Sequence, residues 1–174
     1  MRELINSIEQ EYRRYKKLAE DAIRQLDESQ LDLPTPGFDN SIATLVWHIS
    51  GNLKSRFTDF LTSDGEKPWR ARDEEFEARR VTAADLFTKW EDGWGVVLAA
   101  LQALHDEDLG KTVTIRQQPL LVHQALHRSL AHTSYHVGQI VYIAKSAKGT
   151  AWTSLSIPPG KSKEYNANPT RERP

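Results

Sequence analysis

Two histidines four residues apart near the end of the chain form the first pattern with a chemical meaning. His132 and His136 lie in the stretch LAHTSYHVGQIV, inside a long apolar segment with the helical period. Because a helix turns roughly 100° per residue, side chains four positions apart lie one turn apart on one side, where two imidazoles reach a single metal ion. Buried histidines satisfied by hydrogen bonds explain the same spacing, so the spacing alone leaves both interpretations open.

Positions on a helical wheel separate this pair from a second pair with the same spacing. With His123 as zero, the apolar side chains of residues 121–144 fill an arc from roughly 160° to 340°. His132 and His136 fall at roughly 180° and 220°, inside that arc, whereas His127 falls near 40° among polar residues. We therefore expect His123 and His127 on the solvated face, and His132 and His136 beside the core.

A third histidine is expected on another helix. His48, in TLVWHISGN, lies at the edge of an apolar stripe, about 60° from Leu45 and about 100° from Ile49, so it can face the seam between helices. Three imidazoles leave at least one coordination position open, which is typical of catalytic rather than structural zinc. Such sites suit zinc, nickel, copper or iron. A carboxylate-bridged di-iron site needs Glu-x-x-His pairs, which the sequence lacks.

Three polar residues lie within one helical turn of these histidines and are candidates to contact the substrate or the imidazoles. Asn52 follows His48 by one turn, Arg128 precedes His132 by one turn, and Gln139 comes three residues after His136. Surface or capping roles explain each of them as well. Because the helix of His132 contains no acid, any carboxylate that orients its imidazoles has to come from another helix, or backbone carbonyls do so instead.

Four segments with the helical period must position these residues, and they predict an all-α protein. Their approximate bounds are 2–28, 40–61, 82–105 and 119–147, with Asn40 or Ser41 and then Thr82 as N-caps, and Pro119 in a first turn. A two-residue alternation at Thr112–Ile115 is too short to build a sheet alone.

The economical packing of four such helices is a four-helix bundle. The connection between the second and third helices is about 18 residues long, enough to cross the end of the bundle, and this favours an up-down-down-up order. We expect one bundle domain over 1–148, followed by a polar, proline-rich tail over 149–174 that packs on the bundle or is partly disordered.

Composition excludes several function classes. The chain has 174 residues, a net charge of −1 and no cysteine, so disulfides, thiolate nucleophiles and cysteine-based metal sites are excluded. The sequence has no glycine-rich phosphate loop and no Gly-x-Ser-x-Gly elbow. Its balanced charge argues against a nucleic-acid partner, and no apolar run approaches the length of a membrane span. The charged N-terminus lacks an apolar signal core, so we expect a cytoplasmic protein.

The charges are unevenly distributed along the chain. Residues 109–163 contain no Asp or Glu but carry several Lys and Arg residues, among them Arg116 and Arg128. Residues 1–108 carry the compensating acid, so attraction between two parts of one fold is the first interpretation. An anion-binding surface is the alternative.

Three stretches together resemble the DinB-like superfamily of four-helix metal-binding proteins. They are VWHISGNLKSRFTDFLTSDGEKPWRARDEEF, HRSLAHTSYHVGQIVYIAK and WTSLSIPPGKSKEYN. The likeness is to a branch without an assigned function. It implies an up-down-down-up bundle with a divalent metal, commonly nickel or zinc, held at positions that match His48, His132 and His136. It also implies a homodimer.

The resemblance implies thiol chemistry, because characterised members of the superfamily include thiol-dependent transferases and an isomerase. We therefore expect a metal-dependent enzyme that activates a low-molecular-weight thiol, or else a water for hydrolysis, on a small-molecule substrate. The alternatives are a non-enzymatic metal-binding or stress-response protein of the same fold, and a metal-free helical scaffold with histidines in its core.

Overall fold

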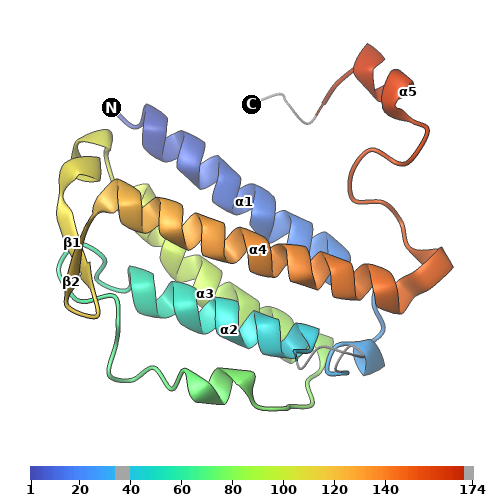
Figure 1. Ribbon diagram of the computed structural model, residues 1–174, viewed down its shortest axis with the longest axis horizontal. Coiled ribbons are helices and arrows are strands. Elements are labelled where there is room, and N and C mark those ends of the chain that lie inside the picture. The colour runs from blue at the N-terminus through green and yellow to red at the C-terminus, as the bar shows by residue number, and fades with distance from the viewer. Residues whose placement is uncertain (34–39, 171–174) are drawn as a thin grey trace.

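The chain is mostly helical, as the sequence predicts. The computed structural model describes residues 1–33 and 40–170, and Figure 1 shows the arrangement of their elements. The long helices are α1 (Glu3–Ile23), α2 (Ile42–Phe57), α3 (Ala83–Ala103) and α4 (Val122–Lys148), and a short helix α5 (Ser162–Ala167) follows them. Strands β1 (Thr112–Ile115) and β2 (Gln118–Leu121) form an antiparallel hairpin between α3 and α4.

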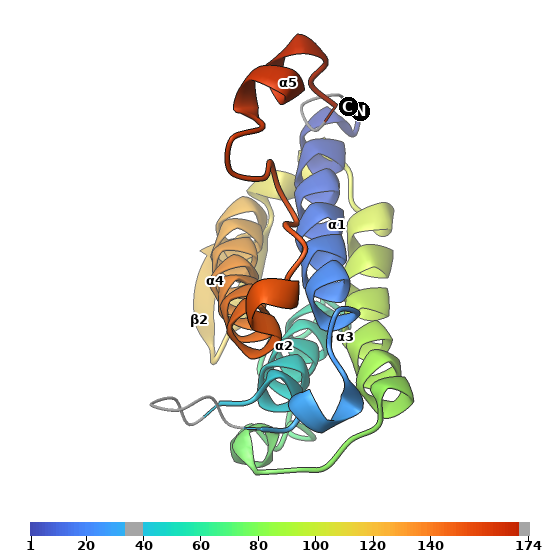
Figure 2. The ribbon, with the colours of Figure 1, turned by 90° about the vertical axis from the view of Figure 1, so that its right-hand side faces the viewer.

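The four long helices lie side by side and bury one apolar core between them (Figures 1 and 2). Helix α2 packs along α3, and α1 packs along α4. A Cβ atom added to Gly93 of α3 would lie 2.5 Å from the Cα of Ser50, so only glycine permits this approach of α2 and α3. The approach fixes the part of α2 that carries His48. Within the described residues, every helix is too short or too polar to cross a lipid bilayer.

Local hydrogen bonds explain where the helices begin and end. The hydroxyl groups of Ser41 and Thr82 each accept a hydrogen bond from the backbone N–H three residues later, which confirms both predicted caps. Helix α4 ends before Gly149, whose φ of 58° is in the left-handed region.

Two of the predicted helices are too long. Helix α1 ends at Ile23, because the backbone N–H groups of Gln25 and Leu26 bond to carbonyls three residues back and tighten the chain. Helix α2 ends at Phe57, and Asp59 has a φ of 50°. The predicted break at 34–39 lies outside the described residues.

The β-hairpin corrects the prediction that Pro119 opens the last helix. Pro119 lies in β2 opposite Thr114, and α4 begins at Val122. The turn residues Arg116 and Gln117 have φ values of 55° and 61°, and both backbone N–H groups donate to the carboxylate of Asp64, at 2.8 and 2.7 Å. The alternation at Thr112–Ile115 is the first strand of this hairpin. Its turn residues give no hairpin signal, because such turns favour Asn-Gly, and an acid from a distant loop stabilises the turn instead.

The first part of the C-terminal segment contacts the helices. Trp152 and Leu155 are half-buried against the core, and the backbone of Thr153 hydrogen-bonds with the side chain of Gln25. Beyond them the chain leaves the long helices, and α5 stands apart from them in Figure 1.

Candidate metal centre

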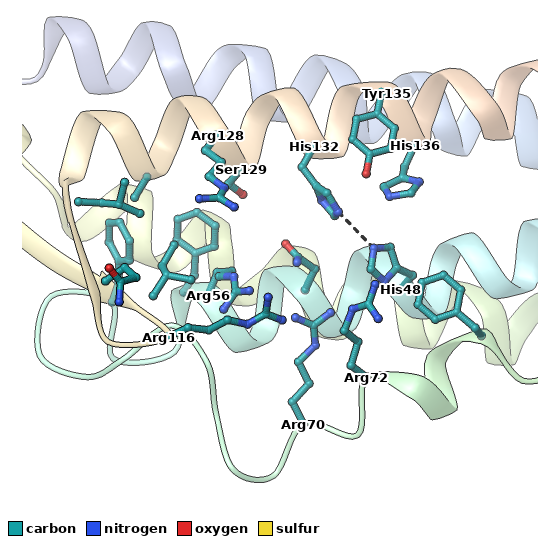
Figure 3. Close-up of a pocket in the computed structure, with 18 residues that line it drawn as sticks. His48, Arg56, Arg70, Arg72, Arg116, Arg128, Ser129, His132, Tyr135 and His136 are labelled. Atoms are coloured by element: carbon teal, nitrogen blue, oxygen red, sulfur yellow. Dashed lines mark hydrogen bonds between the residues drawn. The ribbon is translucent and has the colours of Figure 1, made fainter.

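Three histidines from two helices meet at one point of the structure. His48 comes from α2, and His132 and His136 come from successive turns of α4 (Figure 3). One ring nitrogen of each lies within 4.8 Å of the others. The Nε2 atoms of His48 and His132 are 3.2 Å apart, close to the separation of about 3.3 Å between two ligands in a tetrahedral zinc site. The predicted juxtaposition of these residues is therefore present.

Hydrogen bonds at the far side of two rings turn their lone pairs toward the same point. Nδ1 of His48 lies 2.9 Å from Oε2 of Glu75, and Nδ1 of His136 lies 2.7 Å from Oε1 of Gln139. Because both oxygens are acceptors, each Nδ1 carries the proton, and in the neutral rings each Nε2 is then a bare acceptor. Nε2 of His136 is buried and has no hydrogen-bond partner among the described residues. A cation fits this arrangement, since a buried lone pair otherwise has no partner.

Burial keeps the imidazoles of α4 in the form that binds metals. Burial lowers the pKa of His132 to about 3, and the neighbouring charges of His136, His48, Arg70 and Arg56 add to this effect. Burial also lowers the pKa of His136 to about 4, against the opposing hydrogen bond to Gln139. Both rings are therefore neutral near pH 7, as metal ligation requires.

Glu75 supports His48 from the connection between α2 and α3. It lies in a 3₁₀ turn at Asp73–Phe76, and its side chain is only 8% exposed. Nε and Nη2 of Arg70 each donate to one of its oxygens at 2.8 Å, so Glu75 joins Arg70 to His48. Burial alone would raise the pKa of Glu75, but the hydrogen bonds from His48 and Arg70 outweigh it and lower the pKa. The carboxylate is ionised and orients the ring.

Gly51 makes room for this carboxylate. A Cβ atom at Gly51 would lie 2.1 Å from Oε1 of Glu75, a distance that no side chain can tolerate without displacing the glutamate. On the other side, the ring of Phe76 lies 4.7 Å from that of His48. Residue types and spacings in the sequence do not reveal Glu75 and Arg70, because both lie in an irregular loop and become neighbours of His48 only through the fold.

The histidines open into a cleft of about 420 Å³. Asn52 and Arg128 line it, as does Tyr135, whose ring lies 5.3 Å from that of His132. Gln139 does not line this cleft and instead holds His136 from outside. No carboxylate from another helix contacts the imidazoles of α4 among the described residues. For His136 the amide of Gln139 takes the orienting role that the sequence assigned to a carboxylate or a backbone carbonyl. Nδ1 of His132 is buried and has no hydrogen-bond partner among the described residues.

The second histidine pair lies elsewhere. His127 is exposed and His123 is half-buried, with its Nδ1 3.0 Å from the carbonyl oxygen of Leu109. Neither belongs to the cluster. The wheel therefore separates the two pairs correctly, although His123 is less exposed than expected.

Comparison with known proteins identifies one family. Residues 1–161 match the model of the family described as "Protein of unknown function (DUF1572)". No curated protein matches the chain.

Proposed function

The chain belongs to the DUF1572 family of unknown function, and we propose that it is a metal-dependent enzyme with one divalent ion held by His48, His132 and His136. The observation that carries this proposal is the opening of three converging imidazoles into a cleft. Catalytic zinc sites have three protein ligands and one position that a substrate can reach, and the cleft of about 420 Å³ supplies the access. Zinc and nickel suit three imidazoles.

We propose thiol transfer as the reaction and hydrolysis as the second choice. A divalent ion at such a site lowers the pKa of a bound thiol or water, so that a nucleophile forms at neutral pH. In thiol transfer the sulfur forms a bond to an electrophilic carbon, the leaving group departs with the electrons of the broken bond, and the thiol proton goes to solvent. The chain's own contribution is to orient His48 through Glu75 and His136 through Gln139.

The proposal also covers the superfamily, the order of the helices and the oligomeric state. The resemblance to the DinB-like superfamily, with three histidines at its ligand positions, supports placing this family there. The long connection between α2 and α3 supports the up-down-down-up order. A homodimer is part of the proposal, and light scattering tests it, because a monomer at micromolar concentration would contradict it.

The alternative is a metal-binding protein without turnover. It has the same ligands, and a site sealed from solvent would favour it. The open cleft beside the histidines favours the enzyme instead.

The experiment offers the metal-loaded protein a panel of low-molecular-weight thiols with electrophiles, and a panel of esters and amides. We expect a rate above background with at least one thiol pair, and loss of that rate in His132→Ala. Turnover of esters or amides alone would select hydrolysis. No rate with any substrate in a protein that holds its metal would contradict the enzyme and favour the alternative.

A further inference from the structure

Arginines gather along the cleft that begins at the histidines. They come from α2, from the connection between α2 and α3, from the hairpin turn and from α4, and Figure 3 shows them along one length of the cleft. No Asp or Glu lies among the described residues that line it. The arginines are Arg56, Arg70, Arg72, Arg116 and Arg128.

Carboxylates behind the cleft neutralise only part of this charge. Glu66 is shared, since it pairs with Arg56 at 3.3 Å and with Arg116 at 2.8 Å. Glu75 is already bonded to Arg70 and His48, and Asp73 pairs with Arg72 at 3.6 Å. A positive surplus confined in a cleft with apolar walls attracts anions strongly, because the low dielectric and the shape concentrate the field.

Two of the arginines have donors to spare. Arg116 uses its Nε for Glu66, and its terminal nitrogens make no hydrogen bond within the part of the chain that the structure describes. Arg128 makes no ion pair there. By contrast, Arg56 and Arg70 are held by Glu66, Gly65 and Glu75 and serve the fold as well. The terminal nitrogens of Arg116 and the guanidinium of Arg128 are therefore available to donate to the oxygens of a carboxylate or a phosphate.

The rest of the lining limits the kind of anion. Arg128 precedes His132 by one turn of α4, about 6 Å along the helix axis, so a short molecule reaches both. Apolar side chains also line the cleft, which suits a hydrocarbon portion better than a bare inorganic ion. They include Phe57, Phe60, Ile115 and Leu120.

We propose that the substrate is a small organic anion, whose carboxylate or phosphate group binds Arg116 and Arg128 while its reacting group faces His132. The assignment of a reacting group rests on the proposed function, whereas the anion site does not. The proposal also gives a role to residues 109–163, the stretch without Asp or Glu that contains both arginines. Of the two interpretations of this stretch, it favours an anion-binding surface.

The experiment is an NMR titration of the full-length protein, with its metal and after chelation. The probes are 4-phenylbutyrate, phenyl phosphate, the neutral 4-phenylbutyramide and inorganic phosphate. We expect both organic anions to bind the metal-free protein at least about tenfold more tightly than the amide does. The reason is that one charge-assisted hydrogen bond lowers the dissociation constant by about tenfold. The tighter of the two identifies the preferred group.

Variants locate the binding. Arg116→Gln and Arg128→Gln should each weaken anion binding by about tenfold, whereas Arg13→Gln, which removes one exposed charge on α1, should not. Equal affinity for the amide, unchanged affinity in both cleft variants, or inorganic phosphate binding as tightly as the organic anions would overturn the proposal. The titration of the chelated protein tests the anion site independently of the metal. Anion selectivity without turnover would therefore contradict only the proposed function. Metal binding without anion selectivity would contradict only the proposed anion site.

Discussion

Replacing Glu75 by glutamine should weaken metal binding although Glu75 is not itself a ligand. Its carboxylate accepts from Nδ1 of His48 at 2.9 Å and from two nitrogens of Arg70 at 2.8 Å. A glutamine has one acceptor oxygen and one donor nitrogen. If the oxygen takes the place of Oε2, the NH₂ group meets the Nε–H of Arg70. If the oxygen takes the place of Oε1, the NH₂ group meets both the Nδ1–H of His48 and the Nη2–H of Arg70.

The size of the effect follows from burial. The side chains of Arg70 and Glu75 are 2% and 8% exposed, so the substitution leaves a buried guanidinium without its counter-charge. We expect the metal-free Glu75→Gln variant to lose about 3 kcal/mol of unfolding free energy. This value is at the low end for a broken buried ion pair, because the glutamine keeps one acceptor oxygen. Metal affinity should fall ten- to hundredfold, about 1.4–2.7 kcal/mol, the usual effect of removing a carboxylate behind a ligand histidine.

Two measurements separate these effects. Competition with a chromogenic chelator gives the metal affinity, and urea unfolding of the chelated protein gives the stability. Glu74→Gln is the matched control, because Glu74 is the exposed neighbour. Combining Glu75→Gln with Arg70→Met removes the unpaired guanidinium, so stability should recover while metal affinity stays low. Wild-type metal affinity in Glu75→Gln would refute the orienting role of Glu75.

Two further predictions concern the same site. In the metal-free protein the pKa values of His132 and His136 are about 3 and 4, below their ordinary value of 6.5, so the unfolded chain binds more protons at acid pH. Stability to urea should therefore be constant above about pH 6.5 and fall as the pH drops toward 4, and a midpoint that rises with acid would contradict the burial of neutral rings. Gly51→Ala should lower metal affinity by displacing Glu75, whereas Gly95→Ala, whose added Cβ contacts nothing within 4 Å, should not; equal affinities in both variants would contradict the close approach of Gly51 and Glu75.

The helical period of apolar residues predicts which side chains of a helix face the core. The apolar stripe of α4 places His132 and His136 toward the core and His127 in solvent, and the structure agrees because that helix has one buried face. The caps at Ser41 and Thr82 are equally local, since each is a hydroxyl that bonds to a backbone group three residues away.

What the sequence does not predict depends on contacts between distant residues. The hairpin turn at Arg116 and Gln117 is stabilised by Asp64, and the orientation of His48 by Glu75. Neither acid carries a local signal, because their positions in an irregular connection are set only when α2 and the hairpin have folded. The same holds for the arginines of the cleft, which converge from separate elements.

Metal analysis of the protein purified without a histidine tag decides whether the three histidines form a metal site. We expect about one zinc or nickel ion per chain, its loss in His132→Ala, and its retention in His127→Ala, which removes a histidine from the pair of identical spacing on the same helix. Full metal content in His132→Ala, or an equal loss in both variants, would contradict the site.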